Sequence, residues 1–176
     1  MKESSRIWNE LVMAKHYTLC ISKYTSRQRK INQWVDIVIV SLSILSIVGY
    51  YFHPCIPIGG VVITLIWKYA KSIFPFFKQS EKELTELDAL HTFYESYLNR
   101  LEHFWYLQYN SKIDDDVLMS LFFREKESEA NKKALLNKLQ KKIKNSDSED
   151  TQREAEEYLN QVFKSYETDK STEQST

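Results

Sequence analysis

The stretch that decides the fold is Ile37–Trp67, IVIVSLSILSIVGYYFHPCIPIGGVVITLIW, which contains no Asp, Glu, Lys or Arg. In the whole chain of 176 residues, charged residues make up 27%. Around a short His53–Pro57 loop lie two apolar segments, Trp34–Phe52 with 19 residues and Ile56–Phe77 with 22. Since a helix needs roughly 20 mainly apolar residues to cross the hydrocarbon core, we predict two membrane passes joined by a tight loop.

A signal peptide and a buried hairpin of a soluble helical bundle are the two alternatives to a membrane hairpin. A signal peptide does not fit, because a long polar segment comes first and no small-residue cleavage site follows the first span. The soluble hairpin stays open as the alternative, although the run is long and continuously apolar for a buried core.

Overall composition favours an all-α protein without a nucleic-acid site. The 24 basic and 24 acidic residues cancel to a net charge of zero, whereas nucleic-acid binders are typically basic. The three glycines and three prolines all fall between Gly49 and Pro75, which leaves long helices elsewhere. Cys20 and Cys55 are expected on opposite sides of the membrane or within it, so no intramolecular disulfide is expected.

The charges around the hairpin predict that both termini are cytoplasmic. The connecting loop has no charged residue apart from His53, whereas basic residues precede the first span and follow the second. Positive charge is retained on the cytoplasmic side of membrane proteins. The basic residues before the first span are Lys2, Arg6, Lys15, Lys23, Arg27, Arg29 and Lys30.

The chain divides into four predicted regions. These are an amphipathic helix over 4–33, the transmembrane hairpin over 34–77, a cytoplasmic helical region over 78–166 and a disordered tail over 167–176. The stripe on the first helix consists of Ile7, Leu11, Ala14, Thr18 and Ile21. Within 78–166 we expect long amphipathic helices over 117–144 and 150–166, separated by a linker at 145–148. The last helix carries Ala155, Tyr158, Leu159, Val162 and Phe163.

A heptad pattern follows the hairpin. Its positions, three and four residues apart, are Leu84, Leu87, His91, Tyr94, Leu98, Leu101 and Trp105. Such a seam packs on other helices or on copies of itself, so all of these except His91 are candidate interface residues. We interpret His91 as a packing residue.

Three neighbouring aspartates, Asp114–Asp116, follow a break at Asn110-Ser111. They suit a helix N-terminus, where the macrodipole favours negative charge. A divalent cation is the alternative, but the spacing matches no EF-hand loop.

Polar residues in and beside the spans are candidates for a pore or gate. Lys68 and Lys71 lie three residues apart near the cytoplasmic edge, where they either snorkel to the headgroups or form a positive ring among several copies. Asp36 is placed to pair with one of them. Ser43 and Ser46 on the first span are candidates to line a path or bond across helices.

No catalytic motif is present in the sequence: it has no Gly-rich phosphate loop, HExxH, CxxC or GxSxG. The spans also offer few ionisable groups. We therefore expect neither an enzyme nor a cofactor or metal site.

The order of segments resembles a known family. A basic cluster, KYTSRQRKINQW, runs into a first span, VDIVIVSLSILSIVGYYF, and after the second span comes ELDALHTFYESYLNRLEHF. Over residues 4–110 this layout resembles the SLATT-type two-transmembrane effectors of bacterial anti-phage, CBASS-like conflict systems.

The resemblance implies an effector that oligomerises and permeabilises the bacterial inner membrane, leading to abortive infection. A partner in such systems senses infection and makes or binds a nucleotide signal. This chain has no recognisable nucleotide-binding domain, so residues 111–166 are expected to dock a separate sensor or signal synthase. The runner-up interpretation is a membrane-anchored adaptor that docks a cytoplasmic partner through its helical region.

Overall fold

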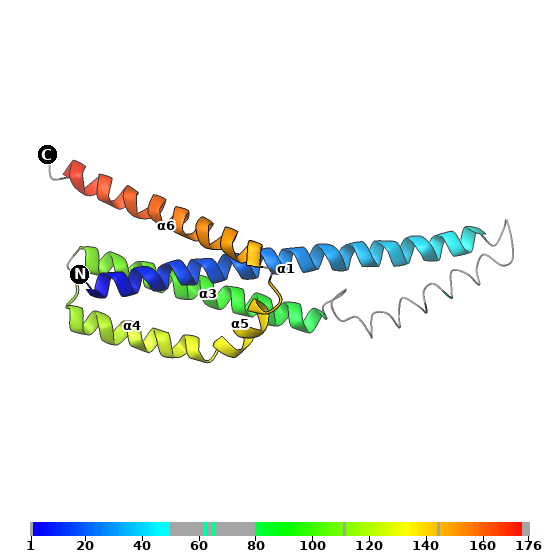
Figure 1. The fold of residues 1–176 in the computed structure, drawn as a ribbon, viewed down its shortest axis with the longest axis horizontal. Coiled ribbons are helices and arrows are strands. Elements are labelled where there is room, and N and C mark those ends of the chain that lie inside the picture. Colours follow the sequence, from blue (N-terminus) through cyan, green and yellow to red (C-terminus); the bar gives the residue numbers. More distant parts are fainter. Residues whose placement is uncertain are drawn as a thin grey trace. The chain divides into compact units, whose positions relative to one another are not determined.

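The structure is a computed structural model that describes residues 2–49, 62, 65, 80–110, 112–143 and 145–173. In these ranges the elements are α1 (Lys2–Gly49), α3 (Glu81–Tyr109), α4 (Asp115–Ala130), α5 (Lys133–Gln140) and α6 (Asn145–Glu173), with no strand (Figure 1). The predicted all-α class is confirmed at this level.

Helix α1 is continuous over 48 residues and crosses the predicted boundary between residues 33 and 34. It contains no proline, and its only glycine is Gly49 at the end, so nothing in its sequence breaks it earlier. The rest of the predicted hairpin, apart from Val62 and Leu65, lies outside the described residues, and the second span therefore stays a prediction. In the ranges that are described, no helix combines the length and apolar character needed to cross a membrane.

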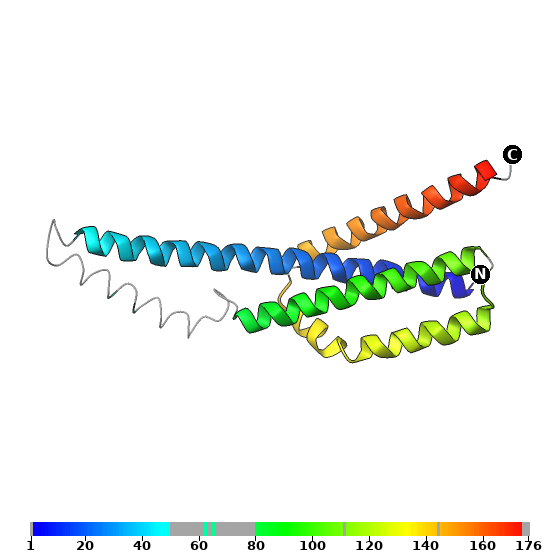
Figure 2. The same cartoon turned by 180° about the vertical axis from the view of Figure 1, so that it is seen from behind.

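The chain divides into two compact units. Unit 1 comprises Met1–Lys23 and Leu87–Thr176, and unit 2 comprises Tyr24–Glu86. In unit 1, the first part of α1 lies beside α3, while α4 and α6 lie on opposite sides of this pair in both views (Figures 1 and 2).

The predicted apolar stripe of α1 forms the centre of unit 1. All five of its members are buried: Ile7, Leu11, Ala14, Thr18 and Ile21. The Thr18 hydroxyl donates to the Ala14 carbonyl oxygen at 2.9 Å, so a polar side chain fits the stripe with its hydrogen bond made inside the helix.

Helix α3 begins with a capping box at Ser80 and Glu83. The Glu83 amide donates to the Ser80 hydroxyl at 3.2 Å, and the Ser80 amide donates to the Glu83 carboxylate at 3.3 Å. This reciprocal pair satisfies two amides that a helix start leaves without partners.

The heptad on α3 needs a correction at two positions. Leu90 is buried where the pattern named His91, which instead lies 3.5 Å from Glu95 and is partly exposed. Phe104 is buried beside the predicted Trp105, and Tyr97 is also fully buried. The physical reason is that α3 contacts more than one helix, so its buried side is wider than the narrow seam of a coiled coil.

The predicted helix over 117–144 is two helices. Asn131 and Lys132 form a turn in which the Lys132 amide donates to the Glu129 carbonyl at 2.8 Å. Asparagine is a poor helix former, and the break lets Leu136 and Leu139 of α5 be buried. The aspartates do occupy a helix start, since Asp115 and Asp116 form the first turn of α4.

The boundaries of the last helix also differ from prediction. Helix α6 begins at Asn145, inside the predicted linker, and continues to Glu173, through most of the predicted disordered tail. No glycine or proline interrupts this segment, and nothing else in its composition forces a helix to end. Ala155, Leu159 and Phe163 are buried as their spacing predicts.

Candidate functional site

In unit 2, the second half of α1 exposes large apolar side chains. Trp34 and Leu45 are each 68% exposed. Together with five further exposed residues they form what we call the apolar surface of α1: Trp34, Ile37, Val38, Val40, Ile44, Leu45 and Val48. At about 3.6 residues per turn, these positions share one broad side of the helix.

The other side of this segment is mostly apolar as well, with Asp36 and Ser43 as polar residues. Val35 is buried, and Ile39 and Leu42 are partly buried. A helix that is apolar all round belongs in the core of a large protein or in a membrane, and soluble monomers rarely expose large contiguous apolar patches. The apolar surface of α1 is therefore more favourable in an apolar environment than in water.

Basic side chains precede this surface on the same helix. Lys23, Arg27, Arg29 and Lys30 are exposed, and Trp34 follows them one turn later. The order along α1 is thus basic, then aromatic, then aliphatic. It matches the order of headgroups, interface and hydrocarbon at the cytoplasmic side of a bilayer.

The pore candidates fall partly in this segment. The exposed Ser43 hydroxyl donates to the Ile39 carbonyl oxygen at 2.8 Å, so its hydrogen bond is made within its own helix. Asp36 is exposed at the start of the apolar surface. The side chain of Ser46 and all of Lys68 and Lys71 lie outside the described part of the chain, and the pairing of Asp36 with a lysine stays a prediction.

The interface candidates lie inside the chain. Leu84 is buried in unit 2, and four more are buried in unit 1: Leu87, Tyr94, Leu98 and Leu101. The Trp105 ring contacts Phe163 with a centroid distance of 4.0 Å and stacks on Tyr109 at 4.8 Å. The heptad seam is expected to pack either on other helices or on copies of itself. In the structure it packs on other helices of the same chain. Contact between copies through these residues would require the chain to open.

A polar network joins α1, α3 and α4; it is buried at Tyr94, Tyr97 and Glu129 and partly exposed at Lys126. The Tyr97 hydroxyl donates to Glu10 Oε1 at 3.1 Å, and the Tyr94 hydroxyl donates to Glu129 Oε1 at 3.1 Å. Lys126 Nζ donates to Glu10 Oε1 and lies 2.9 Å from Glu129 Oε2. Two carboxylates thus share one ammonium and two phenols, and every member has a partner, as buried polar groups require.

Burial and neighbouring charges shift the pKa values of the two tyrosines and the lysine in this network. Burial, and then the charge of the neighbouring glutamate, raises the pKa of Tyr94 and Tyr97 well above 10, so both phenols remain hydrogen-bond donors. Burial lowers the pKa of Lys126, but its hydrogen bonds to Glu10 and Glu129 outweigh this and raise it overall. The network is therefore a fixed connection between helices.

A second polar cluster lies where α6 meets α1, and we call its members His16, Cys20 and Thr151 the α1–α6 junction. The Thr151 hydroxyl oxygen lies 2.9 Å from Cys20 Sγ and 3.1 Å from His16 Nδ1. It also lies 2.9 Å from the Asp147 and Ser148 carbonyl oxygens, to which it can donate its single proton.

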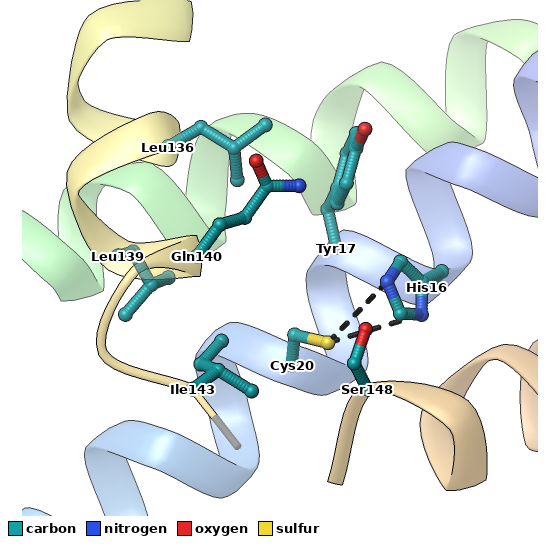
Figure 3. A pocket seen from close by; sticks show the side chains of 8 residues that line it. All are labelled: His16, Tyr17, Cys20, Leu136, Leu139, Gln140, Ile143 and Ser148. Carbon is teal, nitrogen blue, oxygen red and sulfur yellow. Dashed lines mark hydrogen bonds between the residues drawn. The ribbon is translucent and has the colours of Figure 1, made fainter. Parts of the chain in front are cut away.

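Beside this junction is a cavity of about 140 Å³ (Figure 3). In the figure, Cys20 Sγ and the His16 ring point toward one another, at 3.6 Å between Sγ and Nε2. The lining residues are His16, Tyr17, Cys20, Leu136, Leu139, Gln140, Ile143 and Ser148. The cavity is smaller than the roughly 300 Å³ at which most ligand pockets begin.

A thiol beside an imidazole is also the arrangement of a cysteine nucleophile. Here, however, burial lowers the pKa of His16, against the effect of its hydrogen bond with Thr151. Burial raises the pKa of Cys20, against the effects of Thr151 and Lys23. Nucleophilic cysteines need a lowered pKa, so this geometry suits a neutral, packed junction.

Four further contacts attach α6 along its length. Lys23 Nζ lies 2.6 Å from Glu154 Oε1, and Lys15 Nζ lies 3.5 Å from the centroid of the Tyr158 ring. Phe163 contacts Trp105 and, at a centroid distance of 5.2 Å, Trp8. Along its first five turns, α6 is thus attached to α1 and α3 first by polar side chains and then by aromatic ones.

The sequence alone contains part of the signal for the junction. His16 and Cys20 are four residues apart, which puts them on adjacent turns of one helix face. Thr151 is a distant residue with no local pattern that connects it to them. No local pattern connects the members of the buried network either, because they come from three helices.

No protein-family model, no curated protein and no solved structure matches this chain.

Proposed function

We propose that this protein is a membrane effector whose hairpin, residues 34–77, enters the bacterial inner membrane. Copies of the chain assemble there and permeabilise or depolarise the membrane, as part of abortive infection in response to phage. The single observation that carries the membrane part of this proposal is the apolar surface of α1.

Transfer of this surface into lipid gives a large free-energy gain. Full burial of one large aliphatic or aromatic side chain contributes about 1.5–3 kcal/mol. Seven such residues in the apolar surface, each already partly shielded, amount to on the order of 10 kcal/mol. The basic segment Lys23–Lys30 lies next to this surface on α1 and suits the anionic cytoplasmic leaflet.

The effector part of the proposal rests on the resemblance to SLATT-type proteins. A two-pass unit encloses no channel by itself, so permeation requires a homo-oligomer. Pore or gating candidates are Asp36, Ser43, Ser46, Lys68 and Lys71. In this proposal unit 1 receives the signal through a separate sensor or nucleotide-signal synthase, with both termini in the cytoplasm.

The test is to induce the protein in bacteria and follow membrane potential with a voltage-sensitive dye, alone and with the products of its neighbouring genes. We expect depolarisation before loss of viability, and dependence on a neighbour would identify a gating partner. An intact potential in both conditions, with the protein confirmed in the membrane, would contradict the effector function.

A second candidate is a membrane-anchored adaptor, which is favoured by the compactness of unit 1. Its helices bury their own apolar core, so it is suited to act as a folded docking module. Replacement of residues 34–77 with an unrelated two-pass anchor separates the two functions. An adaptor retains activity after this exchange, whereas a pore former loses it.

A further inference from the structure

Helix α5 and the turns that flank it carry a dense group of lysines. The segment Lys132–Lys144 contains six lysines and no Asp or Glu. The five that the structure describes are all exposed, and we call them the α5 lysine surface: Lys132, Lys133, Lys138, Lys141 and Lys142.

The buried side of α5 determines which way the α5 lysine surface faces. Leu136 and Leu139 are buried and line the cavity beside Cys20 (Figure 3). The apolar side of the helix is therefore used inside unit 1, and the lysines extend into solvent. They are presented by a docked helix, so their arrangement does not depend on a partner.

These lysines differ from two lysines of unit 1 that are paired with acidic side chains. Lys23 and Lys126 form ion pairs with carboxylates. Across the described ranges, no carboxylate pairs with Lys133, Lys138, Lys141 or Lys142. Four neighbouring positive charges thus lack a counter-charge from the described part of their own chain.

We propose that the α5 lysine surface binds the anionic headgroups of the membrane's cytoplasmic face. This inference rests on the proposed function, because it assumes that the hairpin anchors the chain in that membrane. Lysine clusters on amphipathic helices bind anionic lipid, and each lysine close to the surface contributes about fivefold in affinity. Anchoring raises the effective concentration of lipid, so modest affinity is sufficient.

The composition of the surface favours lipid over nucleic acid. Lysine is a flexible point charge that does not read a phosphate or base in a fixed, bidentate geometry as arginine does. No aromatic residue lies in Lys132–Lys144 on which a base would stack. Directly after it, α6 begins with Asp147, Glu149 and Asp150, which an anionic surface repels. The charge pattern therefore favours contact between the membrane and the side of unit 1 that carries the α5 lysine surface.

The test measures whether anionic lipid covers α5 in the full-length protein. Lys138→Cys is made in a Cys20→Ser, Cys55→Ser background, reconstituted into nanodiscs with or without phosphatidylglycerol, and labelled with a membrane-impermeant maleimide. We expect labelling to be at least about fivefold slower in the anionic nanodiscs, and high salt should remove the difference. Glu157→Cys on the exposed side of α6 serves as the reference position and should label equally in both.

A matched pair of charge variants then assigns the effect to α5. In the Lys138→Cys protein, the added substitutions Lys133→Gln, Lys141→Gln and Lys142→Gln should restore fast labelling at position 138 in the anionic nanodiscs. Neutralising three exposed basic residues elsewhere in unit 1, by Lys112→Gln, Arg124→Gln and Arg153→Gln, changes the net charge equally and should leave labelling slow.

Other outcomes overturn the inference in distinct ways. Equal labelling in neutral and anionic nanodiscs, with the protein inserted in both, contradicts lipid binding by α5 and leaves the proposed function intact. Protection that follows the number of copies per nanodisc and ignores lipid charge assigns the surface to a second copy. A chain that does not enter nanodiscs contradicts the proposed function, and the present inference loses its premise.

Discussion

The Thr151 hydroxyl lies 2.9 Å from the sulfur of Cys20, although 131 positions separate the two residues in the sequence. Both side chains are buried, and the contact joins the first turns of α6 to the last turn of the unit 1 part of α1. This pair gives a direct way to ask whether α6 remains docked when the protein acts.

We predict that Thr151→Cys forms a disulfide with Cys20 under mild oxidation, in a Cys55→Ser background. The new bridge closes a loop of more than a hundred residues, and disulfides typically stabilise by about 2–4 kcal/mol. Mass spectrometry and the shift on a non-reducing gel measure its formation, and chemical unfolding in detergent micelles measures the stabilisation.

Thr151→Cys combined with Cys20→Ser is the control, since it cannot form the bridge. If the single variant stays reduced under conditions that oxidise a solvent-exposed cysteine pair, α6 does not dock on α1 as described. If the bridged protein forms and still depolarises cells, release of α6 at this point is not needed for activity.

Stability should fall as the pH drops below about 6.5, and His16 should account for part of the loss. Burial lowers the pKa of His16 in the folded protein, so the unfolded chain takes up the proton first and the folded state loses stability. The limit for one proton is about 1.4 kcal/mol per pH unit. His16→Gln should flatten the dependence of unfolding free energy on pH below about 6.5, whereas an unchanged slope would assign the loss to other groups.

Removal of one buried phenol should weaken the Glu10–Glu129 network. Tyr97→Phe deletes the hydroxyl that donates to Glu10, and a hydrogen bond to a charged group contributes about 1.5–3 kcal/mol. Denaturant unfolding measures this loss. Tyr106→Phe is the control, because its hydroxyl accepts from Lys112 at the surface and its loss should change stability by less than about 0.5 kcal/mol. Equal effects would show that the buried network is not a special source of stability.

A charge on the apolar surface of α1 should prevent stable membrane insertion. Leu45→Arg puts a cation where the proposal has hydrocarbon, at a cost of about 2.5–3.5 kcal/mol per residue near the centre of a span. Membrane fractionation and carbonate extraction measure the effect. Phe123→Arg, at an exposed aromatic of α4, is the matched control and should have no effect. A Leu45→Arg protein that remains in the membrane contradicts insertion of this surface.

Lys68→Glu with Lys71→Glu should abolish depolarisation while membrane insertion persists, because a negative ring replaces the proposed positive one. The dye assay measures this loss. Lys68→Arg with Lys71→Arg retains the charge and should retain activity. If the glutamate variant kills as well as the natural protein, the two lysines act only as snorkelling anchors.

Local patterns predicted the apolar stripe of α1 well. All five residues from Ile7 to Ile21 are buried, as their spacing predicts. On α3 the same reasoning missed Leu90, Tyr97 and Phe104, since a strict seven-residue repeat assumes one partner helix. The break at Asn131 and the continuation of α6 depend on packing and on weak propensities, which single residues indicate poorly.

For the candidate sites too, the sequence shows the local features and does not show the partners that are distant in the chain. Apolar character in Ile37–Val48 is visible in the sequence, and the structure adds that the side chains of the apolar surface of α1 are exposed. The His16–Cys20 spacing is visible too, but its closing partner on α6 is not, because no local rule links residues so far apart. The buried carboxylates Glu10 and Glu129 look like ordinary surface glutamates until Lys126 and the two tyrosines are placed around them.

The unbroken backbone of α1 within unit 2 has a consequence for the apolar surface. Between Tyr24 and Val48 the helix contains no proline and no glycine, so its backbone N–H groups are paired within the helix. Hydrocarbon offers no partner for a backbone polar group, and a helix is one of the few backbone forms that can enter it with these groups already paired. Transfer of the apolar surface from water to lipid would therefore require no new backbone hydrogen bonds.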